Sequence, residues 1–198
     1  GYNMHKGKGD MDAEKRKRLI IFTSQSFKQK GIRATRMDAI AHGLNISKRT
    51  IYEVYKTKDN LIGACLVSYS ERTKNLFRII ECGSQCPLPR LLGTSKAFVE
   101  NLYKGENAFW HDVTSHYGYI YDAIREIWYA ELARRVSDCQ TEGLVMPGLD
   151  VDCFLGTFTS VLYSARMAGC PHGVLEDSAL FMLRGAMTAR GISEAGVF

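Results

Sequence analysis

Residues 31–61 read GIRATRMDAIAHGLNISKRTIYEVYKTKDNL, and this stretch decides the fold. Apolar residues recur at helical spacing over 37–43, so we predict a short helix there. Gly43-Leu44-Asn45 is a turn signal, because glycine takes positive φ freely and asparagine tolerates it. Ser47 then caps a second helix over 47–55. The pattern therefore predicts two short helices joined by a tight turn.

The second helix carries side chains that can read DNA. Ile51 points inward, while the exposed N-terminal end carries Lys48, Arg49, Thr50 and Tyr52. In a helix-turn-helix motif this end enters the major groove. Lysine and arginine donate to guanine N7 and O6, threonine offers a hydroxyl and a methyl group, and a tyrosine hydroxyl suits a phosphate oxygen. The stretch therefore predicts a DNA-binding surface, with Lys56 and Lys58 beside the phosphates.

From about Lys15 to Leu66 the chain resembles the DNA-binding domain of the tetracycline-repressor (TetR) family. The family pattern begins with an alanine-rich helix that ends Phe-x-x-x-Gly, continues with Thr-Met-Asp-x-Ile-Ala, and closes with Ser-Lys-x-Thr-Leu-Tyr and Lys-x-Lys-x-x-Leu. The matching residues here are Phe27 to Gly31, Met37-Asp38 with Ile40-Ala41, Ser47 to Tyr52, and Lys56-Thr57-Lys58 with Leu61. The departures are Arg36 in place of a threonine, Asn45 in place of a glycine, and Phe22 and Thr23 in place of alanines.

The resemblance implies an all-α protein in two parts. We expect an N-terminal three-helix, helix-turn-helix DNA-binding domain over residues 13–61, and a C-terminal helical ligand-binding and dimerisation domain over residues 62–198. A disordered tail over residues 1–12 precedes them. The DNA-binding residues that we expect are Thr35, Arg36, Ser47, Lys48, Arg49, Thr50, Tyr52, Lys56 and Lys58. Thr35, with Asp38 three residues later, also has the pattern of a capping box.

Charge is divided unevenly along the chain. Residues 1–61 carry a net charge of +8 and residues 62–198 a net charge of −3, which together give the +5 of the whole chain. A polyanion-binding surface is therefore expected in the N-terminal part. A basic run such as Lys15 to Arg18 is by itself equally typical of a solvated helix face. We favour DNA binding because this run precedes a helix-turn-helix pattern.

Beyond Asp59 the periodicity stays helical to the end of the chain, with no alternating strand pattern and no internal repeat. Glycine and proline pairs mark the loops between the last helices. We predict helices over 59–82, 89–103, 106–116, 119–142, 150–168 and 176–190. The order and lengths of these segments resemble the C-terminal domain of the TetR family.

The last two of these segments each carry a broad apolar face. Such helices can simply form core. In TetR-like proteins, however, the corresponding pair packs against its symmetry mate, and a helix-turn-helix protein needs a dimer to read paired half-sites. We therefore favour a homodimer whose interface is formed by Val151, Phe154, Phe158, Val161, Leu162, Leu180, Leu183 and Met187.

Aromatic side chains are concentrated in the middle of the chain. Within the segment 119–142, Tyr121, Arg125 and Trp128 share one helix face, so a cationic group lies among aromatic rings. Ordinary core gives the same pattern, but aromatic walls with a few polar groups also line small-molecule pockets. The residues that we predict to contact an effector are Trp110, His111, Tyr121, Arg125 and Trp128.

Other functions find little support. His111, Asp112 and His116 suggest a metal site only faintly, because positions five apart diverge by about 140° on a helix and no zinc-ligand spacing occurs. There is no catalytic serine elbow, no phosphate-cradling loop and no dinucleotide fingerprint, so we expect neither an enzyme nor a cofactor. No segment reaches the length of a membrane span.

Six cysteines at irregular spacing predict free cytosolic thiols rather than a disulfide scaffold. Cys82 and Cys86 are the one close pair, and they are either incidental thiols or a redox switch.

These features predict a cytoplasmic, homodimeric transcriptional regulator, most simply a repressor that binds a palindromic operator in double-stranded DNA and is released by a small-molecule effector. The alternative is a DNA-binding protein without an effector, either architectural or controlled by a protein partner. The operator, the effector, the regulated genes and the sign of regulation stay open.

Overall fold

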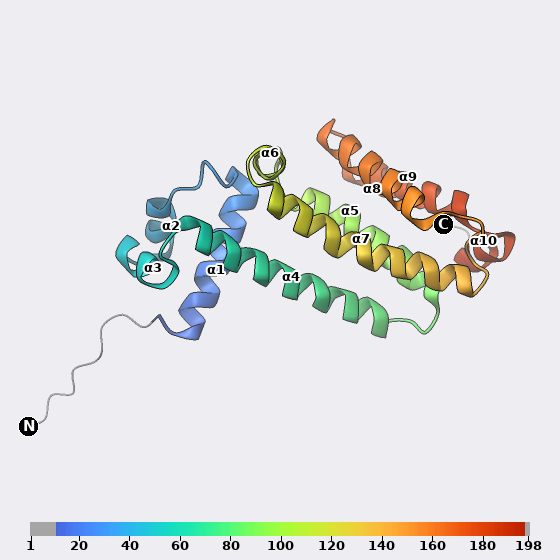
Figure 1. The fold of residues 1–198 in the computed structure, drawn as a ribbon, viewed down its shortest axis with the longest axis horizontal. Coiled ribbons are helices and arrows are strands. Elements are labelled where there is room, and N and C mark those ends of the chain that lie inside the picture. Colours follow the sequence, from blue (N-terminus) through green and yellow to red (C-terminus); the bar gives the residue numbers. More distant parts are fainter. Residues whose placement is uncertain (1–10, 197–198) are drawn as a thin grey trace, which may run out of the picture. The chain divides into compact units, whose positions relative to one another are not determined.

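The structure is a computed structural model that describes residues 11–196. Within that range the regular structure is helical, apart from one isolated bridge between Val145 and Met187. The helices, labelled in Figure 1, are α1 (Ala13–Lys30), α2 (Met37–Leu44), α3 (Lys48–Tyr55), α4 (Lys58–Cys82), α5 (Pro87–Tyr103), α6 (Asn107–Ser115), α7 (Gly118–Thr141), α8 (Val151–Met167), α9 (His172–Ala186) and α10 (Ala189–Ala195). The all-α prediction is confirmed.

The described chain divides into two compact units. The first contains residues 11–71 and 106–117, and the second contains residues 72–105 and 118–196. The first unit therefore includes the start of α4 and the whole of α6, whereas the division expected from the sequence fell at residue 61. None of the described helices is both long enough and apolar enough to cross a membrane.

The first unit begins with a capped helix. Asp12 is the N-cap of α1, and its carboxylate accepts the N–H of Lys15 at 2.8 Å. Met11 is buried, so the last two residues of the expected disordered tail belong to the ordered structure, and the first ten lie outside the described residues. The core takes apolar side chains from each helix of this unit, among them Leu19, Phe27, Ile40, Ile51, Leu61 and Val113.

Two local details around α2 differ from the prediction. Thr35 does not form a capping box, because its hydroxyl donates to the Gly31 carbonyl at 2.7 Å and Arg36 occupies the N-cap position. Gly43 lies inside α2, and Asn45 alone takes the left-handed conformation of the turn, with φ of 54°. A Cβ at Gly43 would collide with the ring of Phe22. This glycine therefore permits the close approach of α1 rather than the turn.

The second unit is built around Trp128 of α7. Its side chain is 2% exposed and packs edge-on against Phe77 of α4, with ring centroids 5.1 Å apart. Phe98 of α5 lies 5.8 Å from Trp128 and 6.5 Å from Phe158 of α8, which is fully buried. Because aromatic side chains bury large apolar areas, these four rings join α4, α5, α7 and α8.

A charged network holds the C-terminal end of α4 within this unit. Arg135 of α7 is fully buried, donates to Glu131 at 2.8 Å and to the Phe77 carbonyl at 3.3 Å, and pairs with Glu81 of α4. Arg134 pairs with the same Glu81 at 2.8 Å. A buried guanidinium is tolerated here because two carboxylates and a carbonyl surround it.

The C-terminal helices differ from the prediction of one helix over 176–190. α9 ends at Ala186, and the chain leaves the helix at Met187, which bridges to Val145. Thr188 then caps α10 by accepting the N–H of Gly191 at 3.1 Å. The apolar periodicity runs on through this break, so the local sequence does not reveal it.

Candidate nucleic-acid interface

The turn between α2 and α3 positions the side chains predicted to read DNA. The Ile46 N–H donates to the Ala41 carbonyl at 3.0 Å and closes the turn. The Ser47 hydroxyl accepts the N–H of Thr50 at 3.0 Å and caps α3. Ile51 is fully buried and so sets the rotation of α3 about its axis. The opposite side of the first turn of α3 faces solvent.

Lys48 and Arg49 are exposed on this first turn. The Arg49 side chain is 84% exposed, and its Nε pairs with Glu53 at 2.8 Å. Lys48 pairs with Asp38 of α2 at 3.0 Å, and the hydrogen bond to Asp38 raises the pKa of Lys48. Ion pairs between exposed side chains are weak, so both cations can exchange these partners for DNA.

Other predicted DNA-binding residues flank this turn. Arg36, Ser47, Tyr52 and Lys56 are exposed, and Thr50 is half-buried. Arg36 begins α2, and Lys56 follows the end of α3 with φ of 51°, its ammonium donating to the Glu53 carbonyl at 3.0 Å. The first unit thus presents cations and hydroxyls on both sides of Lys48 and Arg49.

Thr35 and Lys58 lie in a different environment. Thr35 is 3% exposed, and its hydroxyl donates a hydrogen bond to the Gly31 carbonyl. The Lys58 ammonium donates to the carbonyls of Ile32 at 2.6 Å and Thr35 at 2.7 Å, and desolvation lowers the pKa of Lys58. In the chain without DNA, both side chains therefore contact carbonyls of the segment between α1 and α2.

α6 is attached to the same segment. The buried Asp112 carboxylate accepts the N–H of Arg33 at 2.9 Å, and Arg33 Nη1 lies 2.9 Å from His116 Nε2. A Cβ at Gly31, where φ is 88°, would lie 2.8 Å from Asp112 Oδ2, so a side chain there would strain the backbone and crowd the carboxylate. The sequence gives no signal for this contact, because 79 residues separate Arg33 from Asp112. No cluster of metal-ligating side chains occurs among residues 11–196.

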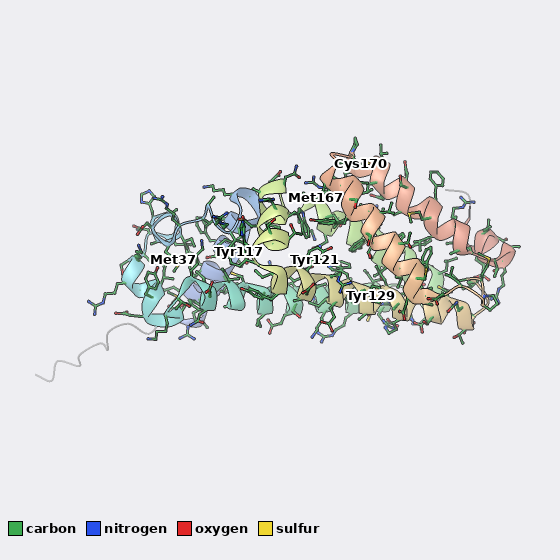
Figure 2. The ribbon with its side chains drawn as sticks, turned by 45° about the horizontal axis from the view of Figure 1, so that its top comes forward. Met37, Tyr117, Tyr121, Tyr129, Met167 and Cys170 are labelled. Atoms are coloured by element: carbon green, nitrogen blue, oxygen red, sulfur yellow. The ribbon has the colours of Figure 1, made fainter. Side chains whose placement is uncertain are left out.

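The predicted effector contacts fall into both units. Trp110 and His111 belong to α6 in the first unit, where Trp110 is buried and His111 is exposed. Tyr121, Arg125 and Trp128 belong to α7 in the second unit, and Figure 2 shows Tyr121 on that helix. Tyr121 is half-buried, Arg125 is exposed and Trp128 lies in the core. The three α7 side chains therefore differ in exposure, and their contact with an effector stays a prediction.

The predicted interface residues also differ in exposure. Phe158, Leu162, Leu183 and Met187 are buried, Val151, Phe154 and Leu180 are half-buried, and Val161 is exposed. Side chains buried within the single chain cannot face a partner. The large apolar side chains exposed on α8 and α9 are Val161, Val174 and Phe181, at 47%, 55% and 68%. The sequence identified only the first of these three.

The family match falls within the N-terminal part of the chain. Residues 23–65 match the family model of bacterial regulatory proteins of the tetR family. No curated protein matches the chain.

Solved structures match nearly the whole chain. A putative TetR-family transcriptional regulator from Rhodococcus sp. is 17% identical, with 89% of this chain and 100% of that chain covered and a TM-score of 0.71. A putative transcriptional regulator from Saccharomonospora viridis in complex with choline is 16% identical, with 89% and 98% covered and a TM-score of 0.75. A TetR transcription regulator from Haloarcula marismortui is 16% identical, with 89% and 100% covered and a TM-score of 0.73. At these identities the likeness shows the fold.

Proposed function

We propose that this chain, whose residues 23–65 match the family model of bacterial regulatory proteins of the tetR family, binds a palindromic DNA operator as a homodimer and releases it when a small-molecule effector binds. The observation that carries DNA binding is the exposed first turn of α3. Ser47 caps this turn and Ile51 anchors it, so that Lys48 and Arg49 project into solvent from a fixed helix.

The side chains of this surface suit different parts of the duplex. Lys48, Arg49 and Thr50 lie at the N-terminal end of α3 and would contact base edges, where a bidentate pair with guanine discriminates by about 1–3 kcal/mol. Ser47, Tyr52, Arg36 and Lys56 flank them and would contact phosphates, which position the helix without reading sequence.

Two copies of α3 are needed to read two half-sites. Half-sites of a helix-turn-helix dimer lie about 34–36 Å apart, and a two-fold operator matches a two-fold protein. We place the dimer interface on the exposed apolar side chains of α8 and α9, namely Val161, Val174 and Phe181. Apolar side chains of this size on neighbouring helices are typical of a surface that a partner covers.

The effector is proposed from the family and from one relative. The similar structure from Saccharomonospora viridis was solved with choline, which supports a small molecule as the signal for this fold. Among the effector contacts expected from the sequence, His111, Tyr121 and Arg125 remain accessible to a ligand. We assign no catalytic activity to the chain.

Selection of genomic DNA fragments by the purified protein, followed by footprinting, tests this function. We expect one protected palindrome whose half-sites are one helical turn apart, with release when a metabolite extract is added. A palindrome that is held in every extract would favour the alternative, a DNA-binding protein without an effector. Binding without any preferred sequence would contradict the regulator function.

A further inference from the structure

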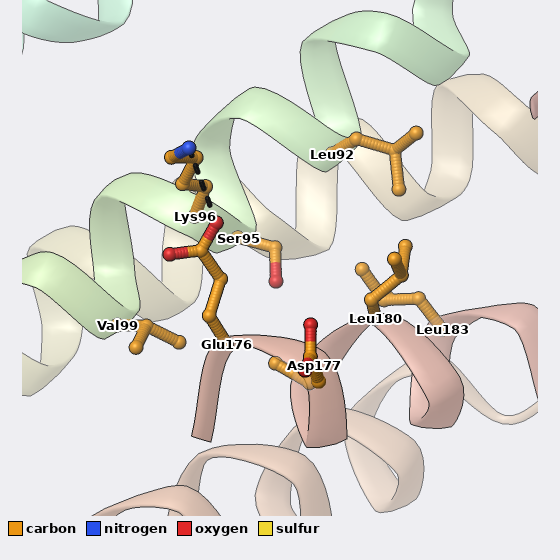
Figure 3. A pocket seen from close by; sticks show the side chains of 9 residues that line it. Leu92, Ser95, Lys96, Val99, Glu176, Asp177, Leu180 and Leu183 are labelled. Carbon is orange, nitrogen blue, oxygen red and sulfur yellow. Dashed lines mark ion pairs between the residues drawn. The ribbon is translucent and has the colours of Figure 1, made fainter. Parts of the chain in front are cut away.

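A hollow of about 230 Å³ lies between α5 and α9 in the second unit (Figure 3). The α5 side chains that line it are Leu92, Ser95, Lys96 and Val99, and the α9 side chains are Glu176, Asp177, Ala179, Leu180 and Leu183. The hollow is separate from the effector contacts expected from the sequence, none of which lines it. Its lining combines an apolar floor with a few polar groups, as small-molecule sites do.

Ser95 is a buried residue of this lining whose hydroxyl has no hydrogen-bond partner among the described residues. The residue is 3% exposed. Figure 3 shows this hydroxyl directed into the space between α5 and α9. The neighbouring Thr94 hydroxyl, by contrast, donates to the Arg90 carbonyl at 2.8 Å. Buried hydroxyls are normally hydrogen-bonded, so Ser95 offers a free donor and acceptor to a ligand.

The charge at the edge of the hollow is negative. Lys96 and Glu176 form an ion pair at 3.1 Å and balance each other. Asp177 forms no ion pair within the described part of the chain, and Figure 3 shows its carboxylate directed toward the hollow. Two carboxylates against one ammonium leave one net negative charge, which favours a cation.

From these observations we propose that the hollow binds a small aliphatic ammonium compound. The hydrocarbon part would lie against Leu92, Val99 and Leu180, and the ammonium would donate to the Asp177 carboxylate and the Ser95 hydroxyl. The volume of about 230 Å³ is below the roughly 300–1,000 Å³ of pockets for drug-sized ligands, so the ligand is small. n-Hexylammonium, which joins an aliphatic chain to a primary ammonium, is a probe of this class.

The site adjoins the proposed interface. Asp177 lies three residues after Val174 and four before Phe181, on the same face of α9, whereas Leu180 lies about 100° from Phe181. The proposal rests on the geometry of the second unit and is independent of DNA binding, since binding is measured without DNA.

A titration of the ¹⁵N-labelled full chain with n-hexylammonium, followed by NMR, tests the proposal. We expect saturable binding of one molecule per chain, with shifts at the amides of Ser95, Asp177 and Leu180. Two probes separate the contributions of chain and charge: n-hexanoate has the opposite charge, and methylammonium lacks the hydrocarbon. Both should bind at least about tenfold more weakly, which corresponds to about 1.4 kcal/mol.

Variants locate the site. Asp177→Asn should weaken the binding of n-hexylammonium about tenfold. Asp122→Asn removes the same charge from an exposed position of α7 and should leave the affinity unchanged. Ser95→Val replaces the hydroxyl by methyl groups that project into the hollow and should weaken binding strongly, and the milder Ser95→Ala should weaken it severalfold. Equal affinity for n-hexanoate, or wild-type affinity in both Asp177→Asn and Ser95→Ala, would overturn the proposal.

Discussion

Arg49 is held by a partner that DNA can replace. Its side chain is 84% exposed, and its Nε pairs with Glu53, one turn further along α3. An i,i+4 pair of this kind contributes about 0.3–0.5 kcal/mol, far less than the 1–3 kcal/mol that a bidentate contact with guanine discriminates. The exchange of Glu53 for a base edge is therefore favourable.

We expect Arg49→Ala to weaken the cognate operator by about 1–3 kcal/mol and to leave binding to random DNA nearly unchanged. Glu53→Gln is the matched control, because it removes the intramolecular partner and leaves the guanidinium in place. Fluorescence anisotropy with cognate and scrambled duplexes at one salt concentration measures both. Equal losses on the two duplexes for Arg49→Ala would remove base reading from this residue.

Lys56 is exposed, whereas the ammonium of Lys58 is hydrogen-bonded, so the two lysines can be compared. Lys58 donates to two carbonyls of the segment between α1 and α2, so Lys58→Met should lower the free energy of unfolding by about 1–3 kcal/mol. Lys56 is exposed, so Lys56→Met should instead reduce the salt slope of DNA binding by about one. Thermal unfolding and salt titrations separate the two effects. A reduced slope with unchanged stability for Lys58→Met would return Lys58 to the DNA contacts.

At the scale of elements, Glu81 joins the end of α4 to two arginines of α7. The hydrogen bond from Arg134 holds the pKa of Glu81 below its usual value, with the charges of Arg135 and Arg90 acting in the same direction. A carboxyl whose pKa is lower in the folded state stabilises the fold above the unfolded pKa of about 4.3. That stabilisation is lost as the pH falls through the folded value.

Glu81→Gln should therefore lower the free energy of unfolding by about 1–2 kcal/mol at pH 7, because Arg135 keeps Glu131 but loses one carboxylate. At pH 3, below the unfolded pKa, the difference from the wild type should be smaller. Urea unfolding at both pH values measures it, and Glu100→Gln, at an exposed position of α5, serves as the control. A loss of the same size at both pH values would show that packing, and not charge, is what Glu81 contributes.

Helix bounds were predictable where local signals mark them. The helix expected over 59–82 is observed as Lys58–Cys82, and Ser47 caps α3 as predicted. The end of α9 was not predictable, because Met187 leaves the helix for a bridge to Val145, which is distant in sequence. Tertiary contacts of this kind override a periodicity that local sequence continues.

In the candidate sites too, local features were predictable and contacts between distant segments were not. Lys48 and Arg49 lie on one short helix, and their exposure could be predicted from its periodicity. The burial of Thr35 and Trp128 and the contacts of Lys58 with two carbonyls could not. The hollow between α5 and α9 and the contact of α6 with Arg33 each join segments far apart in the chain. Single-sequence patterns carry no information about such pairs.

For the whole molecule, the proposed dimer depends on side chains that one chain leaves uncovered. Phe181 is 68% exposed and Val174 is 55% exposed, and the two lie seven residues apart on one face of α9. Leu162 of α8 is fully buried. The same change at Phe181 and at Leu162 should therefore have different consequences.

We expect Phe181→Glu to produce folded monomers, because position 181 faces solvent in the single chain. Their melting temperature should fall only by what dimerisation contributes. In a two-fold interface the new carboxylate appears twice, and desolvating each without a partner costs several kcal/mol. Leu162→Glu, the control, should instead unfold the chain, since it places the charge in the core. Sedimentation measures the oligomeric state and circular dichroism the fold. The Phe181→Glu monomer should also lose most operator affinity, because one chain reaches only one of two half-sites about 34–36 Å apart. A Phe181→Glu chain that still sediments as a dimer would place the interface on other residues, and a monomer that keeps full operator affinity would remove the need for two half-sites.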